Sequence, residues 1–153
     1  MISEAVFADY FKYGIEVGIV EFAEAKEWAY SVIEKEAEPS VEVIDVAMST
    51  GKAQIYDALG LVKGPWQPSL SGAWLFAAMH KMLERGDRPA SSLAAMAHQI
   101  ARSTSDENVC LEFDIIEDEL ELAKRGIYGT EQQCMATLET ALEKHGIPFG
   151  SEI

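Results

Sequence analysis

The chain has few of the residues that build catalytic or metal centres. It contains two cysteines, Cys110 and Cys134, and three histidines among 153 residues. The cysteines are not arranged as Cys-x-x-Cys, so their spacing indicates neither a zinc site nor a redox pair. Two isolated thiols are typical of proteins from a reducing compartment. The sequence therefore offers little for thiol or redox chemistry.

Motifs for other chemistry are also missing. A di-iron bundle needs Glu-x-x-His pairs, but Ala77, Ala95 and Leu142 stand three residues before the histidines. The chain has no H-E-x-x-H zinc motif, no G-x-S-x-G elbow and no glycine-rich phosphate loop. His80 and His98 lie in apolar segments, where a packed histidine is commoner than a metal ligand. We therefore expect no catalytic residues, no metal ligands and no cofactor.

Long hydrophobic runs and basic residues are scarce as well. No apolar run approaches the roughly 20 residues needed to span a bilayer. The start, MISEAVFADY, lacks the basic region of a secretory signal. Twelve bases against 26 acids give a formal net charge of −14, which argues against binding to a phosphate backbone. The sequence predicts a cytoplasmic protein that binds neither membrane nor nucleic acid.

Apolar residues recur at helical spacing along nearly the whole chain. We therefore predict an all-α fold, a single compact domain over residues 1–153 with about seven or eight short helices around an apolar central helix. The tail, 147–153, is predicted to be irregular. The predicted helices are 3–17, 21–36, 39–48, 52–61, 69–85, 89–102, one from the Thr104–Glu107 capping box to before Gly126, and 130–144.

Local signals mark the helix ends and one corner. Gly18 and Gly86 are predicted to close helices, and Thr104–Glu107 and Thr130–Gln133 match capping boxes. The segment Lys63–Pro68 holds two prolines and a glycine, which predicts an internal corner with a packed Trp66. The helix at 69–85 is apolar nearly all round, so we expect Trp74 and Phe76 to be buried there.

The most distinctive segment is acidic. Successive residues advance by about 100° in a helix, which places its apolar residues on a core stripe of Val109, Phe113, Ile116, Leu120 and Ala123. A second apolar line, Leu111, Ile115 and Leu122, runs beside the acids. Between residues 106 and 121 there is no lysine or arginine, and the carboxylates are Asp106, Glu107, Glu112, Asp114, Glu117, Asp118, Glu119 and Glu121.

Two interpretations of this segment are open. In the first, the second apolar line packs on a neighbouring helix and the acids are simply solvated. In the second, the acids and apolar residues form a surface that attracts a basic protein partner. The candidate partner-binding residues are Asp114, Asp118, Glu121 and Glu107. Val109–Ile116 also alternates in polarity, so a short strand is the alternative there, although the capping box favours a helix.

A family resemblance adds a possible function. The segment Tyr13–Ser49 resembles small bacterial immunity proteins of Maf-type polymorphic toxin systems, and Glu119–Gly129 is similar to their penultimate helix and turn. The resemblance covers about a third of the chain. It implies an all-helical cytoplasmic inhibitor that binds and blocks a toxin domain. The residues that carry it in the first segment are Gly14, Gly18, Trp28, Ala29, Glu38, Pro39, Val43 and Ile44.

Three functional classes follow from the sequence. The first is a non-enzymatic acidic binding protein, an immunity protein that neutralises a bacterial toxin. The second is a helical adaptor or regulatory protein whose partner is not a toxin. The third is an enzyme with a carboxylate or thiol site that no motif reveals. The charge balance and the missing catalytic motifs favour the first.

Overall fold

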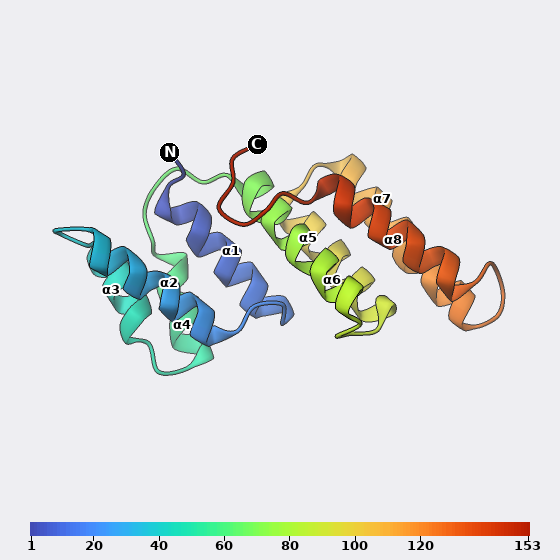
Figure 1. Ribbon diagram of the computed structural model, residues 1–153, viewed down its shortest axis with the longest axis horizontal. Helices are drawn as coiled ribbons and strands as arrows, with labels where there is room; N and C mark the ends of the chain where they lie inside the picture. Colours follow the sequence, from blue (N-terminus) through green and yellow to red (C-terminus); the bar gives the residue numbers. More distant parts are fainter. The chain divides into compact units, whose positions relative to one another are not determined.

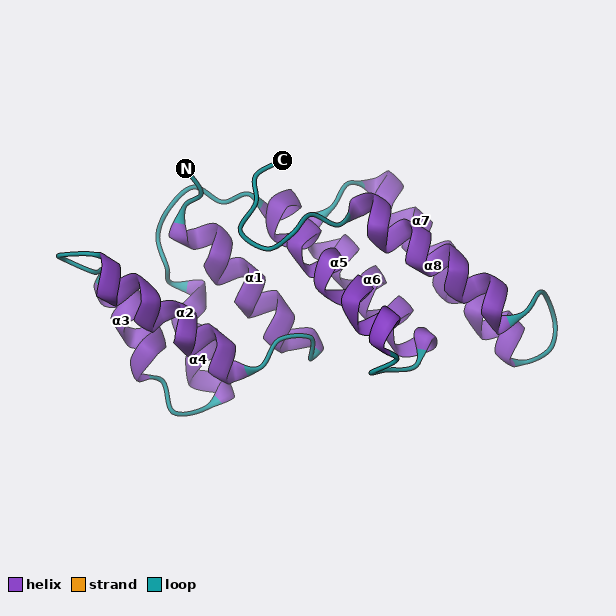
Figure 2. Ribbon diagram, viewed as in Figure 1, coloured by secondary structure: helices purple, strands orange, loops and turns teal.

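The computed structural model describes all 153 residues and contains eight α-helices and no strand (Figures 1 and 2). The all-α prediction is confirmed, and Val109–Ile116 is helical. None of the helices combines the length and the apolar character that a membrane span requires. The chain forms two compact units, Met1–Gln67 and Pro68–Ile153, and the boundary between them along the sequence falls within the predicted corner. A single domain over the whole chain stays a prediction.

The first unit holds the four shorter helices. They are α1 (Glu4–Val17), α2 (Phe22–Lys35), α3 (Val41–Met48) and α4 (Lys52–Gly60). Helix α1 packs on α2 and α4, and α3 packs on the same two helices, so the four close a ring. Small and β-branched side chains such as Ala25, Val43 and Ile55 are fully buried. Short helices can approach closely because these side chains are small.

Aromatic contacts and helix caps organise this unit. Trp28 of α2 stacks on Phe7 of α1 with ring centroids 6.1 Å apart. Gly18 ends α1 in the left-handed conformation, with φ of 83°, as its position in the sequence predicts. A capping box that we did not predict, Glu21 with Glu24, begins α2. The sequence signals for turns therefore hold here, and one more cap exists than we expected.

The predicted packing of Trp66 is wrong. Its side chain is 60% exposed. The segment is held through its backbone, because the Ser3 hydroxyl donates a hydrogen bond of 2.6 Å to the Pro65 carbonyl. Gly64 has a φ of 141°, a conformation that other residues rarely adopt. The corner is thus made by backbone geometry, and the indole is not needed for it.

The second unit is a ring of four longer helices. They are α5 (Pro68–Arg85), α6 (Ala90–Thr104), α7 (Glu107–Lys124) and α8 (Glu131–His145). Helix α5 packs on α6 and α8, and α7 lies against the same pair. Trp74 is fully buried and Phe76 nearly so, as predicted. Phe76 stacks on Phe113 of α7 at 4.9 Å, which carries the core across the ring.

Backbone contacts tie the tail to α5. Gly146 passes so close to α5 that a Cβ added to it would lie 2.9 Å from the Ala77 nitrogen. The Ile147 N–H then donates to the Ala73 carbonyl at 3.0 Å. The Trp74 indole donates to the Ser151 carbonyl at 2.9 Å. The tail is irregular, as predicted, but it is anchored.

The two predicted capping boxes have different outcomes. The box at Thr130 and Gln133 is confirmed at the start of α8. The one at Thr104 is wrong, because Thr104 is the last residue of α6 and its hydroxyl donates to the Ile100 carbonyl. Asp106 caps α7 instead, accepting a 3.0 Å hydrogen bond from the Val109 N–H. The acidic helix therefore starts with one of its own carboxylates.

Candidate binding face of helix α7

Helix α7 buries only one side. Phe113, Ile116 and Leu120 are buried between α6 and α8, which confirms the centre of the predicted core stripe. Val109 and Ala123, at its edges, are partly exposed. The rest of the helix surface carries the carboxylates. Their positions around the axis decide which neighbours they meet.

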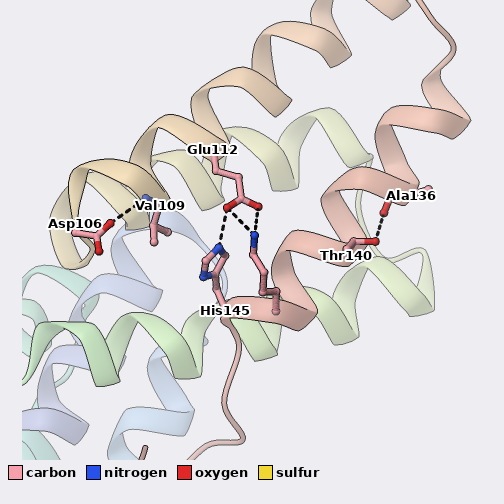
Figure 3. A network of polar contacts seen from close by, with 7 residues as sticks. Asp106, Val109, Glu112, Ala136, Thr140 and His145 are labelled. Carbon is pink, nitrogen blue, oxygen red and sulfur yellow. Dashed lines mark hydrogen bonds and ion pairs between the residues drawn. The ribbon is translucent and has the colours of Figure 1, made fainter.

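On the α8 side, Glu112 is neutralised (Figure 3). Its carboxylate lies 3.0 Å from the Lys144 ammonium and 2.9 Å from His145 Nε2. Partial burial raises the pKa of Glu112, but the hydrogen bonds from His145 and Lys144 outweigh it and hold the pKa below its ordinary value. Glu112 therefore joins α7 to the end of α8 and is not available to a partner.

On the α6 side, His98 meets two carboxylates. Its Nδ1 lies 2.9 Å from Glu117 Oε2, and its Nε2 lies 3.8 Å from Asp114 Oδ1. The side chain of Asp114 is 47% exposed, so this predicted partner-binding residue reaches solvent while sharing a histidine. Asp114 is thus at the edge of the free acidic surface rather than at its centre.

The other acids of the segment have no ion-pair partner. Glu107, Asp118 and Glu121 are exposed, as predicted, and Glu119 is partly exposed. Leu111 is 54% and Ile115 is 47% exposed, so these two residues of the second apolar line do not pack on a neighbouring helix, whereas Leu122 is partly buried. At 100° per residue, Asp114 and the exposed side chains other than Glu119 span an arc of about 120° opposite the core stripe. We call this surface the acidic face of α7, and it consists of Glu107, Leu111, Asp114, Ile115, Asp118 and Glu121.

A surface pocket of about 320 Å³ adjoins one end of the acidic face. Arg102 and His98 of α6 contribute to it, and sequence reasoning missed both. The helical pattern places them on α6 but does not indicate which sides of α6 and α7 face each other across the short turn at 105–106. The lining residues are His98, Arg102, Ser105, Asp106, Glu107, Cys110, Leu111 and Asp114.

The chemistry of the pocket favours binding. Asp106, Glu107 and Asp114 supply carboxylate oxygens, and Leu111 supplies an apolar wall. Both ring nitrogens of His98 face carboxylates, so the imidazole is directed at acids and not at the Cys110 thiol. A volume of this size accommodates one large side chain of a partner. These three carboxylates outnumber the one cation in the lining, Arg102, so a lysine or arginine side chain matches both the net charge and the apolar wall.

The first unit carries a second exposed apolar stripe. Val41 and Met48 of α3 are 68% and 65% exposed, and Ile44 between them is 38% exposed. A backbone hydrogen bond lowers the pKa of the neighbouring acid Glu42, and so does Lys63, which is paired with it at 3.1 Å. The acidic face of α7 is the stronger candidate, because it combines exposed apolar residues, acids without ion pairs and a pocket.

Comparisons with family models, curated proteins and solved structures find no match for this chain.

Proposed function

We propose that this protein is a non-enzymatic acidic binding protein that uses the acidic face of α7 to bind a basic protein partner. The single observation that carries the proposal is the exposure of Leu111 and Ile115 among carboxylates without ion pairs. An acidic surface that serves only solubility has no need of large apolar side chains in its middle. A binding surface needs both, because apolar contacts hold the partner and charges guide its approach.

The energetics of α7 agree with this proposal. Like charges one turn apart, such as Asp114 with Asp118 and Asp118 with Glu121, cost an isolated helix a few tenths of a kcal/mol per pair. The fold gains nothing from them, since the core contacts of α7 come from Phe113, Ile116 and Leu120. A basic partner that supplies counter-charges removes this repulsion.

The pocket suggests how the partner docks. An arginine or lysine entering beside Leu111 would place its charged end near Asp106 or Asp114, while its stem covers the leucine. The stem of such a side chain is apolar, so it suits the wall that Leu111 and Cys110 form. One anchoring side chain in a pocket with charges around it is a common arrangement at protein interfaces.

The further proposal is that the partner is a bacterial toxin domain, which this protein neutralises in the cytoplasm. Its support is the resemblance of Tyr13–Ser49 to Maf-type immunity proteins. Some of the residues that carry this resemblance are packing residues, since Trp28 stacks on Phe7 and Ala29 and Val43 are fully buried. Others, Gly18, Glu38 and Ile44, are exposed. Through its packing residues the resemblance bears on the scaffold, and the acidic face of α7 supplies the proposed contact.

The test compares two triple variants of equal charge. The first, Asp114→Asn with Asp118→Asn and Glu121→Gln, removes three charges from the acidic face. The control, Glu27→Gln with Glu34→Gln and Asp45→Asn, removes three exposed charges from the first unit. Each variant is measured by surface plasmon resonance, at two ionic strengths, against the basic partner domain that a pull-down from the host recovers. Growth of cells that express this domain reports neutralisation.

We expect the first variant to associate more slowly, with a weaker dependence on salt, because charged rims act mainly on the association rate. The control should behave like the unchanged protein. Equal association rates for all three proteins would exclude the acidic face of α7 from recognition. Binding without rescue of growth would favour an adaptor or regulatory role.

A further inference from the structure

A second cluster of ionisable side chains lies away from the acidic face, between α5 and α8. His80 Nε2 lies 3.2 Å from Glu84 Oε1 and 3.7 Å from Glu139 Oε1. The ligand atoms of the three residues are all within 4.8 Å of one another. The sequence alone does not reveal this cluster, because Glu139 comes from a different helix than His80 and Glu84.

The histidine has an unsatisfied nitrogen. Nε2 of His80 is buried and makes no hydrogen bond, although two carboxylates are close to it. A buried polar atom without a partner is uncommon and costs stability, so it calls for an unseen water or ion. No lysine or arginine pairs with Glu84 or Glu139, whose side chains are 55% and 51% exposed. The nitrogen and the two carboxylates thus converge on one point.

We propose that His80, Glu84 and Glu139 bind a divalent first-row transition metal ion, with zinc as the representative case. Zinc binds imidazole and carboxylate ligands at about 2.0–2.2 Å, so two ligands of a tetrahedral ion lie about 3.3–3.5 Å apart. His80 Nε2 lies 3.2 Å from Glu84 Oε1 and 3.7 Å from Glu139 Oε1, and these two distances bracket this range. The imidazole ligand favours zinc or nickel over magnesium and calcium, which prefer oxygen ligands alone.

The proposed ion joins two helices that already pack on each other. His80 and Glu84 are one turn apart on α5, and Glu139 comes from α8. Three protein ligands leave a fourth position of a tetrahedral ion for water. Since the second unit has its own core, the ion adds to stability and is not required for folding. This inference does not rest on the proposed function of α7.

The experiment uses the full chain, freed of metal with a chelator and then dialysed. Isothermal titration with zinc chloride measures stoichiometry and affinity, and magnesium chloride is the comparison ion. Each of the variants His80→Gln, Glu84→Gln and Glu139→Gln is titrated in the same way. The matched control is His98→Gln, because His98 also lies between two carboxylates but meets them through different ring nitrogens.

We expect one zinc ion per chain, no comparable binding of magnesium, and at least about a tenfold loss of zinc affinity in each of the three variants. The His98→Gln protein should bind like the unchanged chain. Zinc affinity should fall as the pH is lowered, because protons compete for the imidazole. Thermal unfolding with zinc should shift upward in the unchanged protein and in the control alone.

Several results would overturn the proposal. One is the absence of saturable zinc binding. Another is a zinc affinity in the Glu84→Gln and Glu139→Gln proteins that equals the affinity of the unchanged chain. Both variants should fold because these carboxylates are exposed. A third is a cobalt complex whose absorption shows a thiolate charge-transfer band, since that would assign the ion to Cys110 or Cys134.

Discussion

Helices α5 and α7 have the same length, 18 residues, and belong to the same unit, yet they are used in opposite ways. Helix α5 buries nine residues and α7 buries three. The apolar residues of α5 surround its axis, whereas those of α7 include two, Leu111 and Ile115, that stay in solvent. The difference shows that α5 sets the stability of the unit, while α7 contributes a surface. Variants in the two helices should therefore affect different measurements.

The largest effect is expected at the centre of α5. Replacing Trp74 with Ala removes a fully buried indole and the hydrogen bond to the Ser151 carbonyl, so unfolding should become easier by about 3–5 kcal/mol. Chemical denaturation followed by circular dichroism measures this change. Trp74→Phe is the control, since it keeps an aromatic ring and should cost less. A loss below about 1 kcal/mol for the alanine would show that α5 is not the centre of the core.

A second test enlarges a residue of α5 instead of truncating one. A Cβ added to Gly72 would lie 2.7 Å from the Thr104 Cβ, so Gly72→Ala must separate α5 from α6. We expect a loss of about 1–3 kcal/mol in the free energy of unfolding. Thr104→Ala combined with Gly72→Ala should recover part of it, because it removes the Thr104 hydroxyl oxygen, which lies even closer to the added Cβ than the Thr104 Cβ does. If the single and double variants lose the same free energy of unfolding, the cost of Gly72→Ala does not come from a clash with the Thr104 side chain.

A third test concerns the ion pairs that join α7 to α8. The pKa of Glu112 is lowered in the folded protein, so its contribution to stability is present above its pKa in the unfolded chain. That contribution is lost as the pH falls through the folded pKa. Glu112→Gln should therefore cost about 0–1 kcal/mol near neutral pH, the range for exposed pairs.

The difference in the free energy of unfolding between the unchanged protein and Glu112→Gln should shrink as the pH is lowered from about 6 to about 3, where glutamates titrate. Denaturation curves of both proteins across this range measure it. A difference that does not change with pH would mean that Glu112 acts through packing alone.

The smallest effect on stability is expected on the acidic face of α7. The triple variant of Asp114, Asp118 and Glu121 should unfold at nearly the same free energy, or be more stable by a few tenths of a kcal/mol, because like charges are removed. Added salt should reduce any gain by screening the repulsion. If the triple variant loses as much free energy of unfolding as Gly72→Ala, the exposed side of α7 contributes to stability as α5 does, and the contrast between the two helices is wrong.

The sequence predicted what depends on neighbours along the chain. Helix positions follow from apolar spacing, and Gly18 and the Thr130–Gln133 box mark ends by local hydrogen bonds. The error at Thr104 is also local, because two residues with side-chain oxygens, Thr104 and Asp106, could each cap α7. Helix α6 extends beyond its predicted end and includes Thr104, so Asp106 caps α7. Local patterns cannot decide such a competition, because α6 could end at either point.

What the sequence could not predict depends on residues far apart in the chain. The corner beside Trp66 is held by the Ser3 contact with Pro65, and Ser3 comes from the other end of the first unit. The cluster at His80 needs Glu139, which no spacing rule connects to α5. The sequence did predict Glu107, Asp118 and Glu121 as exposed, because helix geometry alone places them opposite the core.

The anchored tail has a consequence for proteolysis. Irregular terminal segments are usually digested quickly because nothing holds their backbone. Here Phe149 packs on the Trp74 ring at 5.2 Å, and the indole holds the Ser151 carbonyl. A protease that cuts within residues 146–151 should therefore act slowly while the fold is intact. Cleavage there would free the indole of Trp74, so a change in tryptophan fluorescence would report the moment at which this contact is lost.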